Sequence, residues 1–128
     1  MTLTLVGSIL SPFVRKVRIV LAEKSVPYAH EDLIPFLAPD SFSEISPLRR
    51  IPVLIDPSVE PNWALPDSSA ICSYLERRFP SPCMYPSKAV DLARALWIEE
   101  FADTEFSATI GQKIFRPMVV LPFMGGEA

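Results

Sequence analysis

The stretch "SILSPFVRKVRIVLAEK", Ser8 to Lys24, places a serine and a proline where an apolar strand ends and an amphipathic helix begins. The preceding "TLTLV", residues 2–6, is a β-prone run that ends at Gly7. After Pro12, apolar side chains recur at helical spacing, at Val14, Val17 and Leu21. A proline in the first helical turn loses no hydrogen bond, so Ser11 is the expected N-cap. The stretch therefore predicts a strand followed by a helix.

The next sixty residues continue this alternation. Patterning and turn residues predict strands within "PYAHEDLI", "IPVLID" and "NWALPD", which are residues 27–34, 51–56 and 62–67. A short helix is expected in the irregular "FLAPDSFSEIS", residues 36–46, and a longer one in "SSAICSYLERRF", residues 68–79. The predicted order is β-α-β-α-β-β-α, an α/β domain over residues 1–80.

A Pro-rich linker, residues 81–87, precedes a second region that is entirely helical in pattern. "KAVDLARALWIEEFADTEFSATIGQKIF", residues 88–115, reads as one long helix with apolar positions at Leu92, Leu96, Trp97, Phe101, Phe106, Ile110 and Ile114. We therefore expect residues 88–128 to be the start of a helical domain.

Composition excludes several classes of protein. The 128 residues are 49% hydrophobic and carry a net charge of −3, with an isoelectric point near 5.1, so neither a disordered chain nor a nucleic-acid-binding surface is indicated. No signal peptide or membrane-spanning run is found, which predicts a cytoplasmic protein without a membrane partner. Two distant cysteines, Cys72 and Cys83, and one histidine, His30, encode neither a disulfide scaffold nor a metal site.

Ser11 has two readings from the residues alone. It is an N-cap, or it is a hydrogen-bond donor to an anion held at the positive end of the helix. A Ser-His-Asp hydrolase is set aside, because the only imidazole, His30, lies on a predicted strand and no G-x-S-x-G turn is present.

Two further motifs also have two readings each. In "SPLRRIPVL", residues 46–54, Pro52 either begins a strand or follows a cis peptide bond. In "LPDSSAICSYLE", Asp67 and Ser68 either cap a helix or form an anion site at its N-terminus.

In this order and at these spacings, the three motifs resemble the thioredoxin-like N-terminal domain of the glutathione S-transferases. "SPFVRKVRIVLAEKSVPY" is similar to the serine-type active-site helix, "SPLRRIPVL" to the proline signature, and "PDSSAICSYLERRFP" to the glutathione-binding turn with its helix. The resemblance covers residues 2–86, and "LARALWIEEFADTEF" resembles the first helix of the all-α domain. It implies that the Ile51–Pro52 bond is cis.

The resemblance also implies a role for each site residue. Ser11 would donate a hydrogen bond to the glutathione sulfur and so favour the thiolate. The backbone of Ile51 would pair with the cysteinyl backbone, and Asp67 and Ser68 would hold the γ-glutamyl ammonium and carboxylate. Arg50 either meets the glycyl carboxylate or is a solvated surface charge. The expected glutathione-binding residues are Phe13, Arg50, Ile51, Pro52, Asp67 and Ser68.

By the same resemblance the chain would be a detoxifying transferase. Glutathione would be its co-substrate, no metal would be needed, a small apolar electrophile would be the second substrate, and the protein would be a homodimer. Two alternatives stay open. A glutathione-dependent thiol oxidoreductase would require cysteine at position 11. A non-catalytic assembly module, as in the stringent starvation protein, would not need Ser11, Asp67 and Ser68.

The sequence departs from the family at two places. Ser25 stands where glycine commonly closes the first helix in a left-handed turn. The chain also stops at "RPMVVLPFMGGEA", where members continue with further helices, so we expect it to be a fragment or to be completed by a partner chain.

Overall fold

The computed structural model describes residues 2–126, and the chain divides into two compact units. The first unit ends at Met84 and the second begins at Tyr85.

The first unit is built on a four-stranded sheet in the order β2-β1-β3-β4. Its strands are β1 (Leu3–Val6), β2 (Tyr28–Glu31), β3 (Val53–Ile55) and β4 (Ala64–Leu65). β1 runs parallel to β2 and antiparallel to β3, and β4 is antiparallel to β3. Parallel neighbours need a crossover connection, and helix α1 (Pro12–Glu23) supplies it. All four predicted strands are therefore present.

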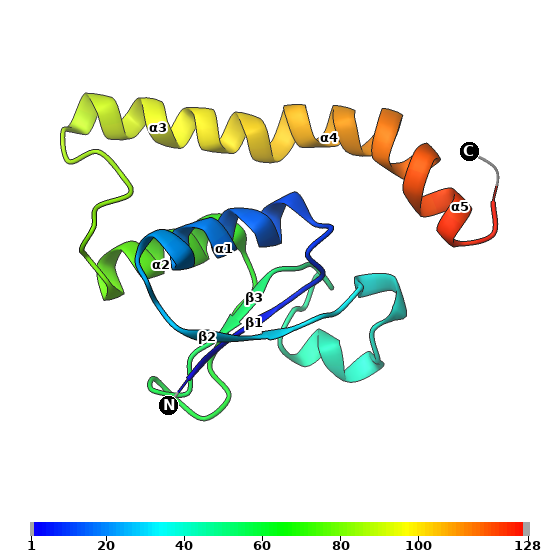
Figure 1. The fold of residues 1–128 in the computed structure, drawn as a ribbon, viewed down its shortest axis with the longest axis horizontal. Helices are drawn as coiled ribbons and strands as arrows, with labels where there is room; N and C mark the ends of the chain where they lie inside the picture. Colours follow the sequence, from blue (N-terminus) through cyan, green and yellow to red (C-terminus); the bar gives the residue numbers. More distant parts are fainter. Residues whose placement is uncertain (1, 127–128) are drawn as a thin grey trace. The chain divides into compact units, whose positions relative to one another are not determined.

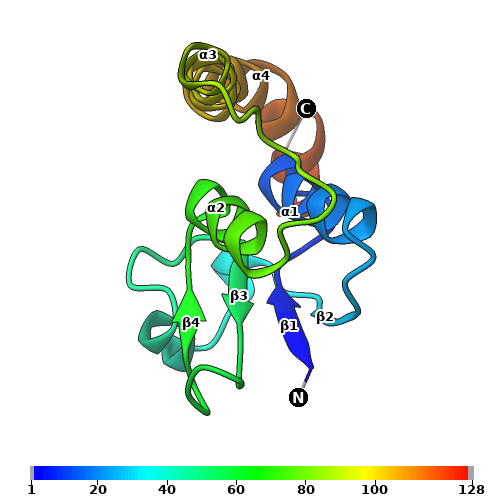
Figure 2. The ribbon, with the colours of Figure 1, turned by 90° about the vertical axis from the view of Figure 1, so that its left-hand side faces the viewer.

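Helices α1 and α2 (Ser68–Arg78) lie next to each other on one side of the strands, as Figures 1 and 2 both show. They bury the apolar positions that recur at helical spacing, which are Val14, Val17, Val20 and Leu21 of α1 and Ile71, Cys72 and Leu75 of α2. This is the thioredoxin-like α/β arrangement expected from the sequence.

The segment between β2 and β3 differs from the expected short α-helix. It forms two 3₁₀ helices, η1 (Pro35–Leu37) and η2 (Asp40–Glu44), separated by Ala38 and Pro39. Proline has no N–H to continue a helical hydrogen-bond ladder, so one α-helix cannot run through this segment. Phe42 of η2 is buried and packs with Val6 and Val53.

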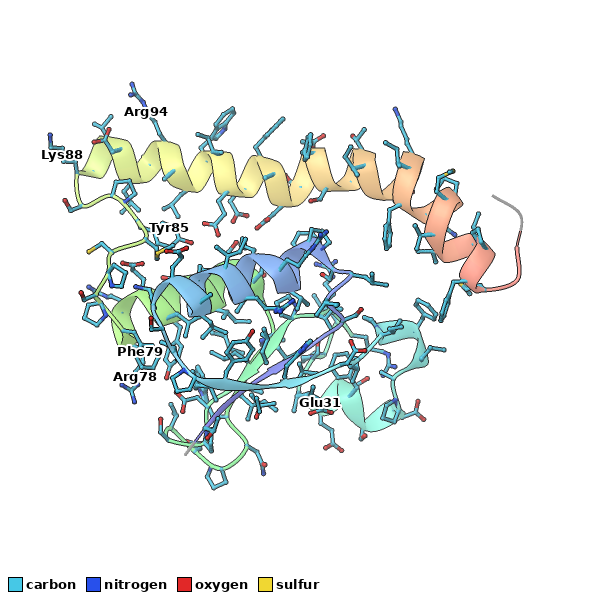
Figure 3. The ribbon with its side chains drawn as sticks, in the orientation of Figure 1. Glu31, Arg78, Phe79, Tyr85, Lys88 and Arg94 are labelled. Atoms are coloured by element: carbon cyan, nitrogen blue, oxygen red, sulfur yellow. The ribbon has the colours of Figure 1, made fainter. Side chains whose placement is uncertain are left out.

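A buried lysine anchors the end of the first unit, a feature that sequence patterning did not indicate. The side chain of Lys24 is fully buried and donates hydrogen bonds of 2.7 Å to the carbonyls of Phe79 and Pro82. Its Nζ also lies 3.4 Å from Glu76 Oε2, and the Glu76 carboxylate accepts the N–H of Met84. Lys24 therefore joins the C-terminal ends of α1 and α2 to residues 79–84. Phe79, whose carbonyl accepts one of these bonds, is labelled in Figure 3.

Ser25 closes α1 in a left-handed conformation, with φ of 53°. The turn has the shape that glycine would favour, although serine occupies it. Serine at this position, where the resemblance predicts glycine, therefore does not change the left-handed shape of the turn.

The second unit is one helical run with changes in its hydrogen-bond pattern. It consists of α3 (Ala89–Phe101), π-helical η3 (Ala102–Phe106), α4 (Ser107–Ile110), π-helical η4 (Gly111–Val120) and α5 (Leu121–Phe123). The helical pattern predicted for residues 88–115 is confirmed, but the run continues through Pro117, which lies within η4. Tyr85, labelled in Figure 3, donates a hydrogen bond to the carboxylate of Glu99 on α3.

The second unit exposes many large apolar side chains. They include Val90, Leu96, Trp97, Ile98, Phe101, Phe106, Ile110 and Ile114. Among the helices of residues 2–126, none combines the length and apolarity that crossing a bilayer requires.

Candidate functional site

The turn between β1 and α1 is held by backbone hydrogen bonds. The N–H of Gly7 donates to the carbonyl of Glu31 at the end of β2, and that of Ser8 donates to Leu33. Ser8 then folds the turn back on itself, because its carbonyl accepts the N–H of Ser11 and its hydroxyl accepts that of Leu10. These hydrogen bonds therefore fix the position of Ser11 at the N-terminus of α1.

Ser11 caps α1, as the sequence predicts. Its Oγ accepts a hydrogen bond of 3.3 Å from the N–H of Val14, and the residue is half-buried. A serine hydroxyl has one donor proton and two acceptor lone pairs, so capping uses one lone pair and leaves the O–H free to donate. Capping and donation to an anion are thus compatible roles for Ser11.

Gly7 brings Ile51 beside this turn. A Cβ at Gly7 would lie 2.6 Å from Val14 Cγ2 and 2.9 Å from Ile51 Cβ, so α1 and the loop before β3 both pack directly on Gly7. The Ile51–Pro52 peptide bond is cis. Within residues 2–126, neither the N–H nor the carbonyl of Ile51 takes part in a hydrogen bond. Ile51 therefore has unbonded backbone groups and lies beside Gly7, in the turn that leads to Ser11.

Asp67 and Ser68 lie at the same end of the strands as Ile51. β3 and β4 are antiparallel with Leu54 opposite Leu65, so the residues just before β3 and just after β4 are neighbours. Asp67 caps α2: its Oδ1 accepts the N–H of Ala70 at 2.8 Å. Its Oδ2 has no hydrogen-bond or ion-pair partner in the described part of the chain.

Ser68 occupies the first position of α2 and is 7% exposed. Its hydroxyl has no hydrogen-bond partner among residues 2–126. The N–H groups and dipole at this end of α2 favour a bound anion. Asp67 and Ser68 together present a carboxylate oxygen and a hydroxyl, which suit an ammonium and a carboxylate.

A cation that the sequence analysis did not consider adjoins this end of α2. Lys16 of α1 donates a hydrogen bond of 3.3 Å to the hydroxyl of Ser69. The contact joins the helix that Ser11 caps to the helix that Asp67 caps. Spacing alone could not reveal it, since the two residues are 53 positions apart.

The two adjacent arginines before Ile51 have different surroundings. The guanidinium of Arg49 donates hydrogen bonds to the carbonyls of Pro35, Ala38 and Pro39 and to the hydroxyl of Ser43. Arg50 is exposed, and its side chain makes no hydrogen bond or ion pair within residues 2–126. Of the two, Arg50 has the guanidinium that is available to a ligand.

The remaining predicted residues adjoin the same region. Phe13, the second residue of α1, is half-buried, and Pro52, immediately before β3, is buried. The structure therefore brings the segments of all the predicted site residues to one end of the strands.

Residues 5–83 match the family model described as glutathione S-transferase, N-terminal domain. Among curated relatives, an uncharacterised GST-like protein of Escherichia coli, YibF, is 36% identical over 99 residues, which are 77% of this chain and 48% of that protein. A stringent starvation protein A homologue of Haemophilus ducreyi is 42% identical over 71 residues, covering 56% of this chain and 31% of that protein. The chain thus spans half or less of these relatives.

The chain is also similar in fold to solved structures of glutathione S-transferases. A glutathione S-transferase from Rhodospirillum rubrum superposes with a TM-score of 0.89 at 28% identity, over 99% of this chain and 56% of that one. A glutathione S-transferase from Methylobacterium radiotolerans, solved in complex with glutathione sulfonate, has a TM-score of 0.73 at 30% identity, over 80% of this chain and 47% of that one.

Proposed function

The chain belongs to the glutathione S-transferase family. We propose that it binds glutathione and that it joins the glutathione sulfur to small apolar electrophiles. The observation that carries the proposal is the geometry of Ser11. Its hydroxyl caps α1, keeps a free donor proton and lies in the turn that packs against the Ile51 loop through Gly7.

In this proposal Ser11 stabilises the thiolate. The O–H donates to the glutathione sulfur, while the Val14 N–H bonded to the same oxygen polarises the hydroxyl and makes it a better donor. A hydrogen bond to a charged group contributes roughly 1.5–3 kcal/mol, which lowers the pKa of the bound thiol by about one to two. The thiolate then attacks the electrophile and displaces its leaving group or adds to its double bond.

The remaining site residues would hold the peptide. The open backbone of Ile51 pairs with the cysteinyl backbone of glutathione, as an added strand pairs with a sheet edge. Asp67 takes the γ-glutamyl ammonium with its unpartnered oxygen, and Ser68 with the α2 N–H groups takes the carboxylate. Arg50 meets the glycyl carboxylate, and Phe13 and Pro52 line the same site.

A second candidate is a non-catalytic assembly module. The similarity to stringent starvation protein A homologues is the observation that favours it. The retention of Ser11, Asp67 and Ser68 at capping positions with unused donors and acceptors favours the glutathione-binding proposal. A thiol oxidoreductase is the least supported, since position 11 holds serine instead of cysteine.

Calorimetry with glutathione tests the proposal directly. We expect the wild-type chain to bind glutathione, and Ser11→Ala to bind within a few-fold of wild type but to form bound thiolate only at higher pH. Ser11→Thr keeps a hydroxyl and should retain the wild-type profile of ultraviolet thiolate absorbance against pH. Absence of glutathione binding to the wild type would leave the assembly module as the better description.

The electrophile, the homodimer, the detoxifying role and the cytoplasmic location stay predictions. The chain spans about half the length of these matched relatives.

A further inference from the structure

A single serine closes the loop that precedes Ile51. The hydroxyl of Ser46 donates a hydrogen bond of 2.8 Å to the carbonyl of Arg50 and accepts one of 2.9 Å from the N–H of the same residue. Ser46 is 1% exposed, so these bonds are shielded from water. One side chain thus binds both backbone groups of Arg50, whereas those of the next residue, Ile51, make no hydrogen bond within residues 2–126.

Arg49 holds the loop at a second point. Its guanidinium reaches three carbonyls and one hydroxyl of residues 35–43, and it lies 5.7 Å from the centre of the Phe42 ring. Arg49 has φ of 52°, a left-handed conformation that is uncommon for a residue other than glycine. Such a conformation persists where surrounding contacts determine it, and the four hydrogen bonds of Arg49 provide them.

Arg49 reaches Ile51 through the apolar cluster, and Ser46 reaches it through the backbone. The side chain of Ile51 packs against the cluster of Phe42, Val6 and Val53. Arg49 covers the Phe42 ring, while Ser46 fixes the peptide unit immediately before Ile51. Loss of either contact would loosen the same short stretch of backbone.

We propose that Ser46 and Arg49 are positioning residues for glutathione, a pair that holds the open backbone of Ile51 in the shape that a peptide ligand requires. The inference rests on the proposed function, and neither side chain touches the ligand. Their effect is preorganisation: the loop is ordered before binding, so the ligand does not have to order it.

The test uses the full chain and the variants Ser46→Ala and Arg49→Gln. We expect both to bind glutathione about tenfold more weakly than wild type, since the ordering of the loop then has to accompany binding. The thiolate of bound glutathione should still form at the wild-type pH, because Ser11 is untouched. In the free protein, the NMR order parameter of the Ile51 N–H should fall from about 0.85 toward about 0.6.

Controls separate positioning from general stability. Tyr74→Phe removes a hydrogen bond to Asp56, at the opposite end of β3, and should lower stability without weakening glutathione binding. Arg77→Gln makes the same charge change as Arg49→Gln at an exposed position of α2 and should have no effect. Ser46→Asn keeps a donor and an acceptor on one side chain and should restore affinity.

The outcomes are distinguishable. An unchanged Ile51 order parameter in both variants, with intact wild-type binding, would overturn the positioning role alone. An equal loss of affinity in Tyr74→Phe would also overturn it, because general destabilisation would then explain the effect. A wild-type chain that does not bind glutathione would overturn the proposed function and the binding part of this inference together.

Discussion

The phenol of Tyr74 on α2 donates a hydrogen bond of 2.5 Å to the carboxylate of Asp56, the residue that follows β3. Asp56 is 2% exposed and also accepts hydrogen bonds from the N–H and hydroxyl of Ser58. Burial by itself would raise the pKa of Asp56, but the bonds from Ser58 and Tyr74 and the charge of Arg78 outweigh it and lower the pKa below 3.8. Burial and the bond to Asp56 raise the pKa of Tyr74, so its donor proton is retained.

This relationship predicts an acid-sensitive contribution to stability. The pKa of Asp56 is lower in the folded state, so the contribution is present above about pH 3.8 and is lost as pH falls through the folded-state value. Tyr74→Phe should lower the free energy of unfolding by about 1–3 kcal/mol at pH 7, because a buried carboxylate loses a donor. Urea unfolding followed by far-ultraviolet circular dichroism checks both effects. A difference between wild type and variant that stays constant until acid unfolds the protein would contradict this account.

Gly7→Ala should be strongly destabilising. The added methyl would lie 2.6 Å from Val14 and 2.9 Å from Ile51, at a φ of 142°. Overpacking and backbone strain together suggest a loss of about 3 kcal/mol. Gly111→Ala is the matched control, since a Cβ added at Gly111 would meet nothing within 4 Å. This variant should be neutral or stabilise the helix by up to about 1 kcal/mol. Thermal unfolding of both variants measures the difference; similar losses would show that Gly7 is not a close-packed point.

Asp67→Asn should separate capping from ligand binding. Asparagine caps helices about as well as aspartate, so α2 should keep its stability while the charge facing a ligand ammonium is lost. We expect weaker glutathione binding in Asp67→Asn, and a smaller loss for a glutathione analogue without the α-amino group. Calorimetry with the two ligands measures both effects. Equal losses for both would mean that Asp67 has no specific contact with the ammonium.

The helical unit should make the isolated 128-residue chain self-associate. Trp97 and Phe101 stack at 5.7 Å between ring centres and are 69% and 46% exposed. Burying a large apolar side chain contributes about 1.5–3 kcal/mol, so association through several of them is favourable. Light scattering should show oligomers that are reduced in the double variant Trp97→Gln and Phe101→Gln but not in Val59→Gln, an exposed apolar residue of the first unit. A monomeric wild type would contradict the expectation.

Several elements followed from local patterns alone. Val14, Val17 and Leu21 predicted α1 and its buried face, and Ser11 and Asp67 were correctly placed as caps. The single short helix predicted within residues 36–46 is wrong, because Pro35 and Pro39 divide this segment into two 3₁₀ helices. The helical run beyond Phe115 was missed, since a proline in a sequence normally argues against a continuing helix.

The sequence by itself determined the order of strands and helices and the residue types available at each turn, because these depend on periodicity, caps and proline, which act over a few neighbours. Only the tertiary structure decided which of two adjacent arginines is engaged and which is open, and that buried Lys24 joins residues 79–84 to both helices. It also decided that Gly7 is the point where α1 and Ile51 meet. Such contacts join residues that are far apart in the sequence, and local patterns do not encode which distant residues come together in the fold.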